Sequence, residues 1–137
     1  MNGHSAGSST GGVRVFSMLN GLVLLGILLQ GLWAGEFIGG VGGADWVEVH
    51  AITGYVVVLL SLVAAIVAVT TLRRRGSGIV GLSITLFVLL LIQVGLGQAI
   101  SDGGQRALVA AHVPVALLAM ALGVYLSVAG ARLRHAS

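Results

Sequence analysis

Long apolar runs alternate with short polar breaks along the whole chain. A helix that spans a membrane needs about 20 mostly apolar residues, and four windows have this length: roughly residues 15–35, 46–72, 79–100 and 107–131. The breaks between them read EFIGGVGGAD, RRRGSG and SDGGQR. Because these connections are short, neighbouring helices are expected to be antiparallel. The pattern therefore predicts an all-α integral membrane protein built as an up-down-up-down four-helix bundle.

The composition supports a membrane protein and narrows its chemistry. The mean hydropathy is +1.07 and 8% of the residues are charged, whereas soluble proteins carry about 25%. The chain has no cysteine, which excludes disulfides and thiolate metal ligands. No surface mixing basic and aromatic residues is apparent, so the predicted partner is the lipid bilayer and not nucleic acid. The expected organisation is a flexible polar tail (1–12), a four-helix transmembrane domain (13–131) and a short basic tail (132–137).

The charged residues are divided between the two ends of the predicted helices. All four acidic residues and one arginine, Arg106, fall at one end. The other arginines fall at the opposite end: Arg14, Arg73, Arg74, Arg75, Arg132 and Arg134. Cytoplasmic ends of membrane helices are enriched in arginine and lysine. Both termini are therefore predicted to be cytoplasmic.

The two halves of the chain resemble each other. ILLQGLWAGEFIGGVGGADWVEVH can be aligned with LLIQVGLGQAISDGGQRALVAAH, which places Gln30 on Gln93 at an offset of 63 residues and His50 on His112 at an offset of 62. Each half is a helix with a late glutamine, an outer turn, and a helix with an early histidine. This pattern predicts an internal two-helix repeat with a pseudo-two-fold axis along the membrane normal.

The repeated histidines are the strongest candidates for chemistry. His50 and His112 are expected at the same depth in the outer leaflet, both facing the bundle axis. Two opposed neutral imidazoles can hold haem iron between them, so His50 and His112 are predicted axial ligands of one haem b. Two alternatives stay open: each histidine is simply solvated at the membrane surface, or the pair binds zinc with help from Glu36 and Glu48.

Other polar residues could support this site. Gln30 and Gln93 are expected either to hydrogen-bond a haem propionate or a ligand imidazole, or to join two helices by a hydrogen bond. Asn20 and Gln98 are assigned the second role. Arg106, at the same end as His112, either pairs with a propionate or is solvated.

These features resemble one half of haem A synthase, an enzyme built from two similar four-helix halves. The resemblance rests on four spans, early histidines on the second and fourth, late glutamines on the first and third, and the sequence AAHVPVALL. It covers Val13 to Gly130. It implies a multi-pass haem-binding bundle in a prokaryotic plasma membrane, with the site toward the outer face and His50 and His112 matching the axial histidines.

The resemblance departs from the family at a catalytic position. The catalytic half carries a glutamate three residues before the first histidine, and here that residue is Val47. Glu48 lies two residues before His50, about 200° around the helix, and is expected to point away. The chain is therefore more similar to the non-catalytic, b-haem-binding half, and whether it is an enzyme stays open.

Three functional hypotheses follow. The first is a b-type haem protein that transfers electrons at the outer face, with quinol, superoxide or a membrane redox partner. The second is a haem A synthase-like assembly factor or oxidoreductase that works as a homodimer. The third is a haem-free transporter subunit or structural protein.

Overall fold

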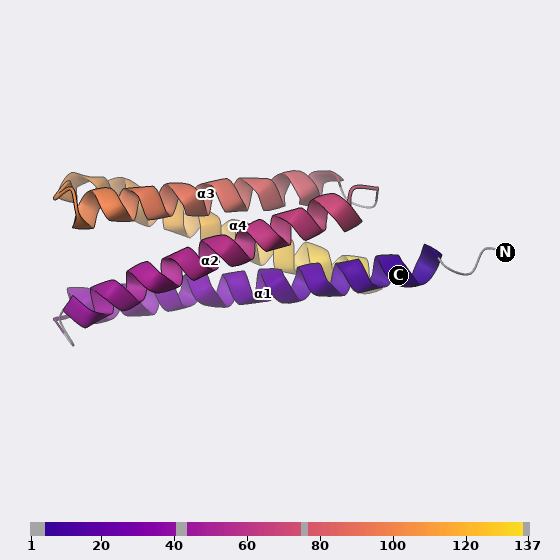
Figure 1. The fold of residues 1–137 in the computed structure, drawn as a ribbon, viewed down its shortest axis with the longest axis horizontal. Helices are drawn as coiled ribbons and strands as arrows, with labels where there is room; N and C mark the ends of the chain where they lie inside the picture. Colours follow the sequence, from indigo (N-terminus) through magenta and orange to yellow (C-terminus); the bar gives the residue numbers. More distant parts are fainter. Residues whose placement is uncertain (1–4, 41–43, 75–76, 136–137) are drawn as a thin grey trace.

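The computed structural model describes residues 5–40, 44–74 and 77–135, and within them the chain is almost entirely helical. The helices are α1 (Ser5–Ile38), α2 (Ala44–Thr71), α3 (Ser77–Ser101) and α4 (Val109–His135), with a 3₁₀ helix η1 (Arg106–Leu108) leading into α4 (Figure 1). All four α-helices are long and apolar enough to cross a membrane. The prediction of an all-helical protein with four candidate membrane spans is confirmed.

The helices extend beyond the apolar windows that predicted them. α1 begins at Ser5 and α4 ends at His135, so both run into segments expected to be tails. Hydropathy marks the part of a helix that crosses the bilayer, whereas helical hydrogen bonds continue into polar residues. Residues 1–4 and 136–137 of the predicted tails, and Arg75 of the arginine triplet, lie outside the described residues.

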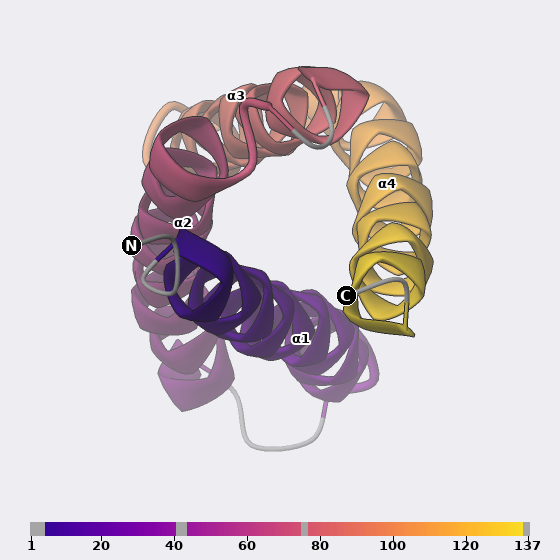
Figure 2. The same ribbon diagram turned by 90° about the vertical axis from the view of Figure 1, so that its right-hand side faces the viewer.

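The four helices form a closed ring around a central axis (Figure 2). α1 packs against α2 and α4, and α3 packs against the same two helices. Across the ring, α2 and α4 have no described Cα atoms within 8 Å of each other. Large apolar side chains such as Leu22, Leu59 and Leu117 are at least half exposed on the outside. This is the surface expected where lipid and not water is the solvent.

Burial divides the bundle into two parts along its length. The buried side chains form a packed tier that begins near the arginine-rich end and stops at Ile27, Val57, Gln93 and Ala119. Beyond this level lies the histidine end, which we define as residues 28–38, 44–56, 94–101 and 109–118. No residue of the histidine end is buried. The buried core therefore occupies one end of the bundle only, among the residues that the structure describes.

The packed tier joins the helices through small and polar residues. Asn20 donates its side-chain amide to the Gly123 carbonyl (3.0 Å) and to the Ser127 hydroxyl (2.7 Å), which connects α1 to α4. Gly26 of α1 lies directly against Val57 of α2, leaving no room for a Cβ atom. Close helix approach at small residues is typical of membrane bundles.

The burial pattern also follows the predicted repeat. Val57 and Ala119 are the first buried residues of α2 and α4, and each follows a histidine by seven residues. Seven residues are about two helical turns, or roughly 10 Å. The two histidines therefore lie at matching heights above the packed tier.

Candidate bis-histidine site

His50 and His112 face each other across the bundle. His50 lies in the second turn of α2 and His112 in the first turn of α4, on helices that are not neighbours in the ring. Their ring centroids are 6.4 Å apart, and the ring planes are inclined by 53°. Because the helix backbones do not touch, it is the side chains that close the distance. The structure thus brings the two sequence-predicted ligands together.

The imidazole of His50 is held by the backbone of α1. Its Nδ1 lies 3.2 Å from the carbonyl oxygen of Gln30. In the tautomer with a proton on Nδ1, this nitrogen donates to the carbonyl and Nε2 keeps its lone pair for a metal. The ring of Phe37 meets the imidazole edge-on at a centroid distance of 5.6 Å. His50 is therefore positioned from the side of α1.

Gln30 acts on His50 through its main chain and not its side chain. The side-chain amide donates instead to the Thr53 hydroxyl at 2.5 Å, and that hydroxyl donates to the Val49 carbonyl at 2.6 Å. Thr53 was not expected to contribute. Thr53 follows His50 by three residues in the sequence HAIT, so the two side chains lie on nearly the same face of α2. This spacing could have identified Thr53 from the sequence.

His112 is held differently, although it is the repeat partner of His50. Gln93 donates its side-chain amide to the main-chain carbonyl of His112 at 2.7 Å, so it fixes the backbone of α4 and not the ring. Gly97 of α3 leaves space beside the imidazole, where an added Cβ would lie 3.8 Å from Cε1. Both glutamines therefore make interhelical hydrogen bonds, which was one of the two roles predicted for them.

Polar atoms without partners gather near the histidine end. Among the described residues, four shielded side-chain polar atoms have no hydrogen-bond partner, and only Ser17 Oγ lies near the arginine-rich end. The others are Trp33 Nε1, Gln93 Oε1 and His112 Nδ1. Shielded polar atoms are nearly always hydrogen-bonded in proteins, so each exception calls for an explanation. A polar or metal-containing ligand at this end would supply partners.

The remaining predicted residues lie at the rim. Arg106, in η1, is exposed. Val47 is 39% exposed and Glu48 is exposed on α2. No group of three or more histidine, cysteine, aspartate or glutamate residues that could hold a metal ion occurs in residues 5–40, 44–74 and 77–135. The metal-binding side chains that the described residues bring together are the two imidazoles of His50 and His112.

Two further pairs of side chains join helices at the histidine end of the bundle. Trp33 and Trp46 stack with centroids 4.9 Å apart and ring planes inclined by 17°. Gln98 donates to the phenolic oxygen of Tyr55 at 2.6 Å, which joins α3 to α2 as predicted for an interhelical hydrogen bond. These contacts connect helices around the site without entering it.

The histidine pair fits the demands of haem iron. With each metal–nitrogen bond about 2 Å long and each ring centre about 1.1 Å behind its nitrogen, two axial imidazoles have centres roughly 6 Å apart. The 6.4 Å separation of His50 and His112 meets this requirement. The histidine end also has no buried core to displace. The residues present are therefore compatible with a bis-histidine haem.

No family model, curated protein or solved structure matches the chain. The resemblance to one half of haem A synthase rests on the spans and motifs described above. The functional argument consequently depends on the geometry of the histidine end.

Proposed function

We propose that this chain is a b-type haem-binding membrane protein, with His50 and His112 as the axial ligands of one haem b. The observation that carries the proposal is the 6.4 Å separation of two imidazoles from non-adjacent helices. The burial pattern supports it, because the side chains of the histidine end are half-buried or exposed and haem would not have to displace a buried core there.

The proposal includes an orientation in a prokaryotic plasma membrane. We place the arginine-rich end and both termini in the cytoplasm, with the helices running up-down-up-down and the haem near the outer leaflet. The short connections and the segregation of arginine from acidic residues support this arrangement. Trp33 and Trp46 then lie near the outer interface, where indole rings are common.

Each residue of the site has a distinct task in this proposal. The Gln30 carbonyl would accept a hydrogen bond from Nδ1–H of His50, which would leave the Nε2 lone pair free for the metal. Gln93 holds the α4 backbone at His112, and Arg106 is available at the rim for a propionate. When bound, haem supplies a one-electron iron couple whose potential depends on its axial ligands and surroundings.

Electron transfer or haem handling is favoured over hydroxylation of haem. The position that carries glutamate in the catalytic half of haem A synthase is Val47, and Glu48 is exposed on α2. No carboxylate therefore stands in that position to support oxidative chemistry at the site. A quinol or a membrane redox partner is the proposed source or acceptor of electrons, and a second copy of the chain is the partner in the haem A synthase-like alternative.

An absorption spectrum of the purified protein tests the proposal. Protein from haem-replete cells, in mild detergent, should show a Soret band and, after reduction, the split α and β bands of low-spin bis-histidine haem. His50→Ala and His112→Ala should each reduce bound haem at least about tenfold. Loss of a residue that only hydrogen-bonds to a metal ligand already costs about tenfold or more, and loss of the ligand itself should cost at least as much. His135→Ala, which alters an exposed histidine at the end of α4, is the matched control.

Two results would refute the proposal. Colourless wild-type protein from haem-replete cells would favour the haem-free alternative. A low-spin spectrum that survives either single substitution would exclude bis-histidine ligation. Activity on haem O with an electron donor would instead favour the enzyme hypothesis over simple electron transfer.

A further inference from the structure

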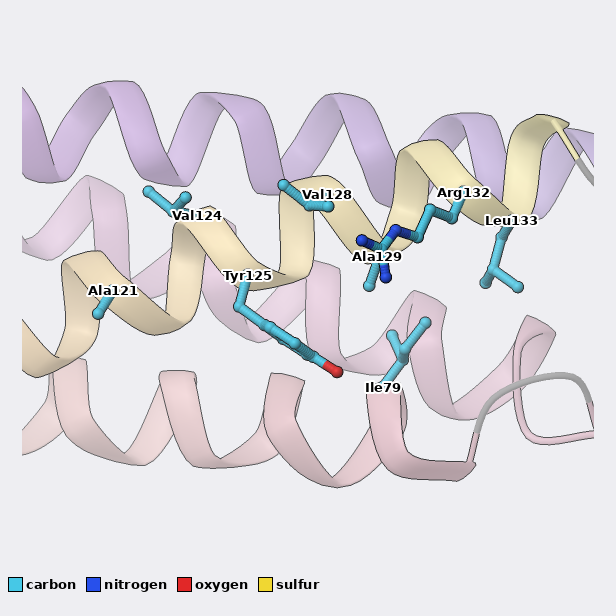
Figure 3. Close-up of a pocket in the computed structure, with 8 residues that line it drawn as sticks. All are labelled: Ile79, Ala121, Val124, Tyr125, Val128, Ala129, Arg132 and Leu133. Atoms are coloured by element: carbon cyan, nitrogen blue, oxygen red, sulfur yellow. The ribbon is translucent and has the colours of Figure 1, made fainter.

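A groove runs along the outside of the bundle far from the histidines. It has a volume of about 480 Å³ and lies between α4 and the start of α3. Its lining residues are Ile79, Ala121, Val124, Tyr125, Val128, Ala129, Arg132 and Leu133 (Figure 3). Val124 and Val128 are each 46% exposed. The groove is thus an open, mainly apolar channel on the surface predicted to face lipid.

The polar groups of the groove are concentrated toward one end. The side chain of Arg132 runs back along α4 toward Ala129, and the ring of Tyr125 extends from α4 toward α3 (Figure 3). Arg132 is exposed and forms no ion pair with a described residue. The four acidic residues of the chain all lie at or near the other end, in or beside the first and third connections. The guanidinium is therefore a cation without an acidic side chain to neutralise it.

The length of the groove matches one leaflet of a bilayer. Ala121 and Arg132 are eleven residues apart on α4, about 16 Å at 1.5 Å per residue. Half of a bilayer's hydrocarbon core is about 15 Å thick. A single acyl chain lying along Ala121, Val124 and Val128 would therefore place its headgroup at the level of Arg132.

The geometry points to an anionic phospholipid as the occupant of this groove, with its phosphate at Arg132 and one acyl chain against α4. Charge complementarity selects the anionic headgroup, because Arg132 lines the groove and Arg14, Arg73 and Arg74 lie at the same end of the bundle. Basic pockets between membrane helices on the cytoplasmic side are recurrent binding sites for such lipids. The inference is independent of haem binding.

Native mass spectrometry of the detergent-purified chain tests the inference. Phosphatidylglycerol and phosphatidylcholine with identical acyl chains are titrated separately. Wild-type protein should retain one phosphatidylglycerol molecule in preference to phosphatidylcholine. Arg132→Gln should weaken phosphatidylglycerol binding about fivefold and leave phosphatidylcholine binding unchanged. Arg134→Gln is the matched control, since Arg134 is exposed on α4 but does not line the groove.

A second variant tests the groove itself. Ala129→Leu should reduce binding of both lipids because the larger side chain fills the channel, and Arg132→Lys should restore most of the headgroup preference. Equal losses in Arg132→Gln and Arg134→Gln would overturn the site, as would equal binding of both lipids by the wild type. Displacement of bound phosphatidylglycerol by a neutral isoprenoid quinone, or dimerisation that occludes the groove, would assign it to another occupant. Circular dichroism shows whether each variant is folded.

Discussion

At the scale of single residues, Asn20 shows what the sequence could and could not predict. The sequence indicated that Asn20 joins two helices, and the structure shows the bonds to Gly123 and Ser127. The sequence also selected His50 and His112 through the repeat. It did not show that Gln30 contacts His50 through its carbonyl while Gln93 contacts the main chain of His112. Such differences depend on side-chain rotamers that near-identical patterns leave open.

Asn20 is only 1% exposed, so loss of its hydrogen bonds should be measurable. Asn20→Ala is expected to lower the free energy of unfolding by about 1–2 kcal/mol, from a lost interhelical bond and a small cavity. A double-mutant cycle with Ser127→Ala, monitored by SDS-induced unfolding, should give a coupling energy of about 0.6 kcal/mol. Strictly additive effects of the two substitutions would contradict a direct bond.

At the scale of helices, the apolar runs predicted the four spans but not the way they meet. The contact between Gly26 and Val57 depends on which helix faces are opposed, and the small residues of a glycine-rich chain do not reveal this. Gly31 and Gly35, which are four residues apart on the same helix, have no described atoms near an added Cβ. The structure thus places close helix approaches at a few of the candidate glycines, among them Gly26, Gly12 against Thr71 and Gly130 against Ser17.

Substitution at this contact should weaken the pairing of α1 with α2. A Cβ at Gly26 would collide with the side chain of Val57, whose branched Cβ limits its freedom to move aside. Gly26→Ala is therefore expected to destabilise the bundle by about 1–3 kcal/mol. Gly21→Ala, at a position with no atoms within 4 Å, should be neutral or slightly stabilising. Thermal unfolding in detergent measures the stability of both variants. Equal changes in stability for Gly26→Ala and Gly21→Ala would exclude the close approach of Gly26 to Val57.

At the scale of the whole molecule, the bundle has a buried core at one end, whereas the described residues of the histidine end are half-buried or exposed. The sequence predicted a four-helix bundle, and hydropathy is high along all four windows. It did not predict that buried residues stop at Val57 and Ala119, since burial depends on the separation of the helices. Local opening is easiest where few apolar contacts are buried. The two ends should therefore differ in dynamics.

Hydrogen exchange can measure this difference. In haem-free protein, backbone amides of the histidine end are expected to exchange roughly tenfold faster than those of the packed tier. Loading with haem should slow exchange in residues 44–56 and 109–118 and leave residues 57–72 nearly unchanged. Peptide-level mass spectrometry gives both comparisons, with the His50→Ala/His112→Ala double variant as the control. Uniform slowing along all helices would contradict a ligand confined to one end.

The position of the packed tier also sets an order of assembly. On α2 and α4 its first buried residues, Val57 and Ala119, follow the histidines by two helical turns, so they can pack during membrane insertion before any cofactor is present. In the proposed function, haem is then the last component to arrive, and it enters a scaffold that already exists. Cells short of haem should accordingly accumulate an inserted, receptive apoprotein and not degrade an unfolded chain. Abundance of the protein would then be decoupled from the supply of its cofactor.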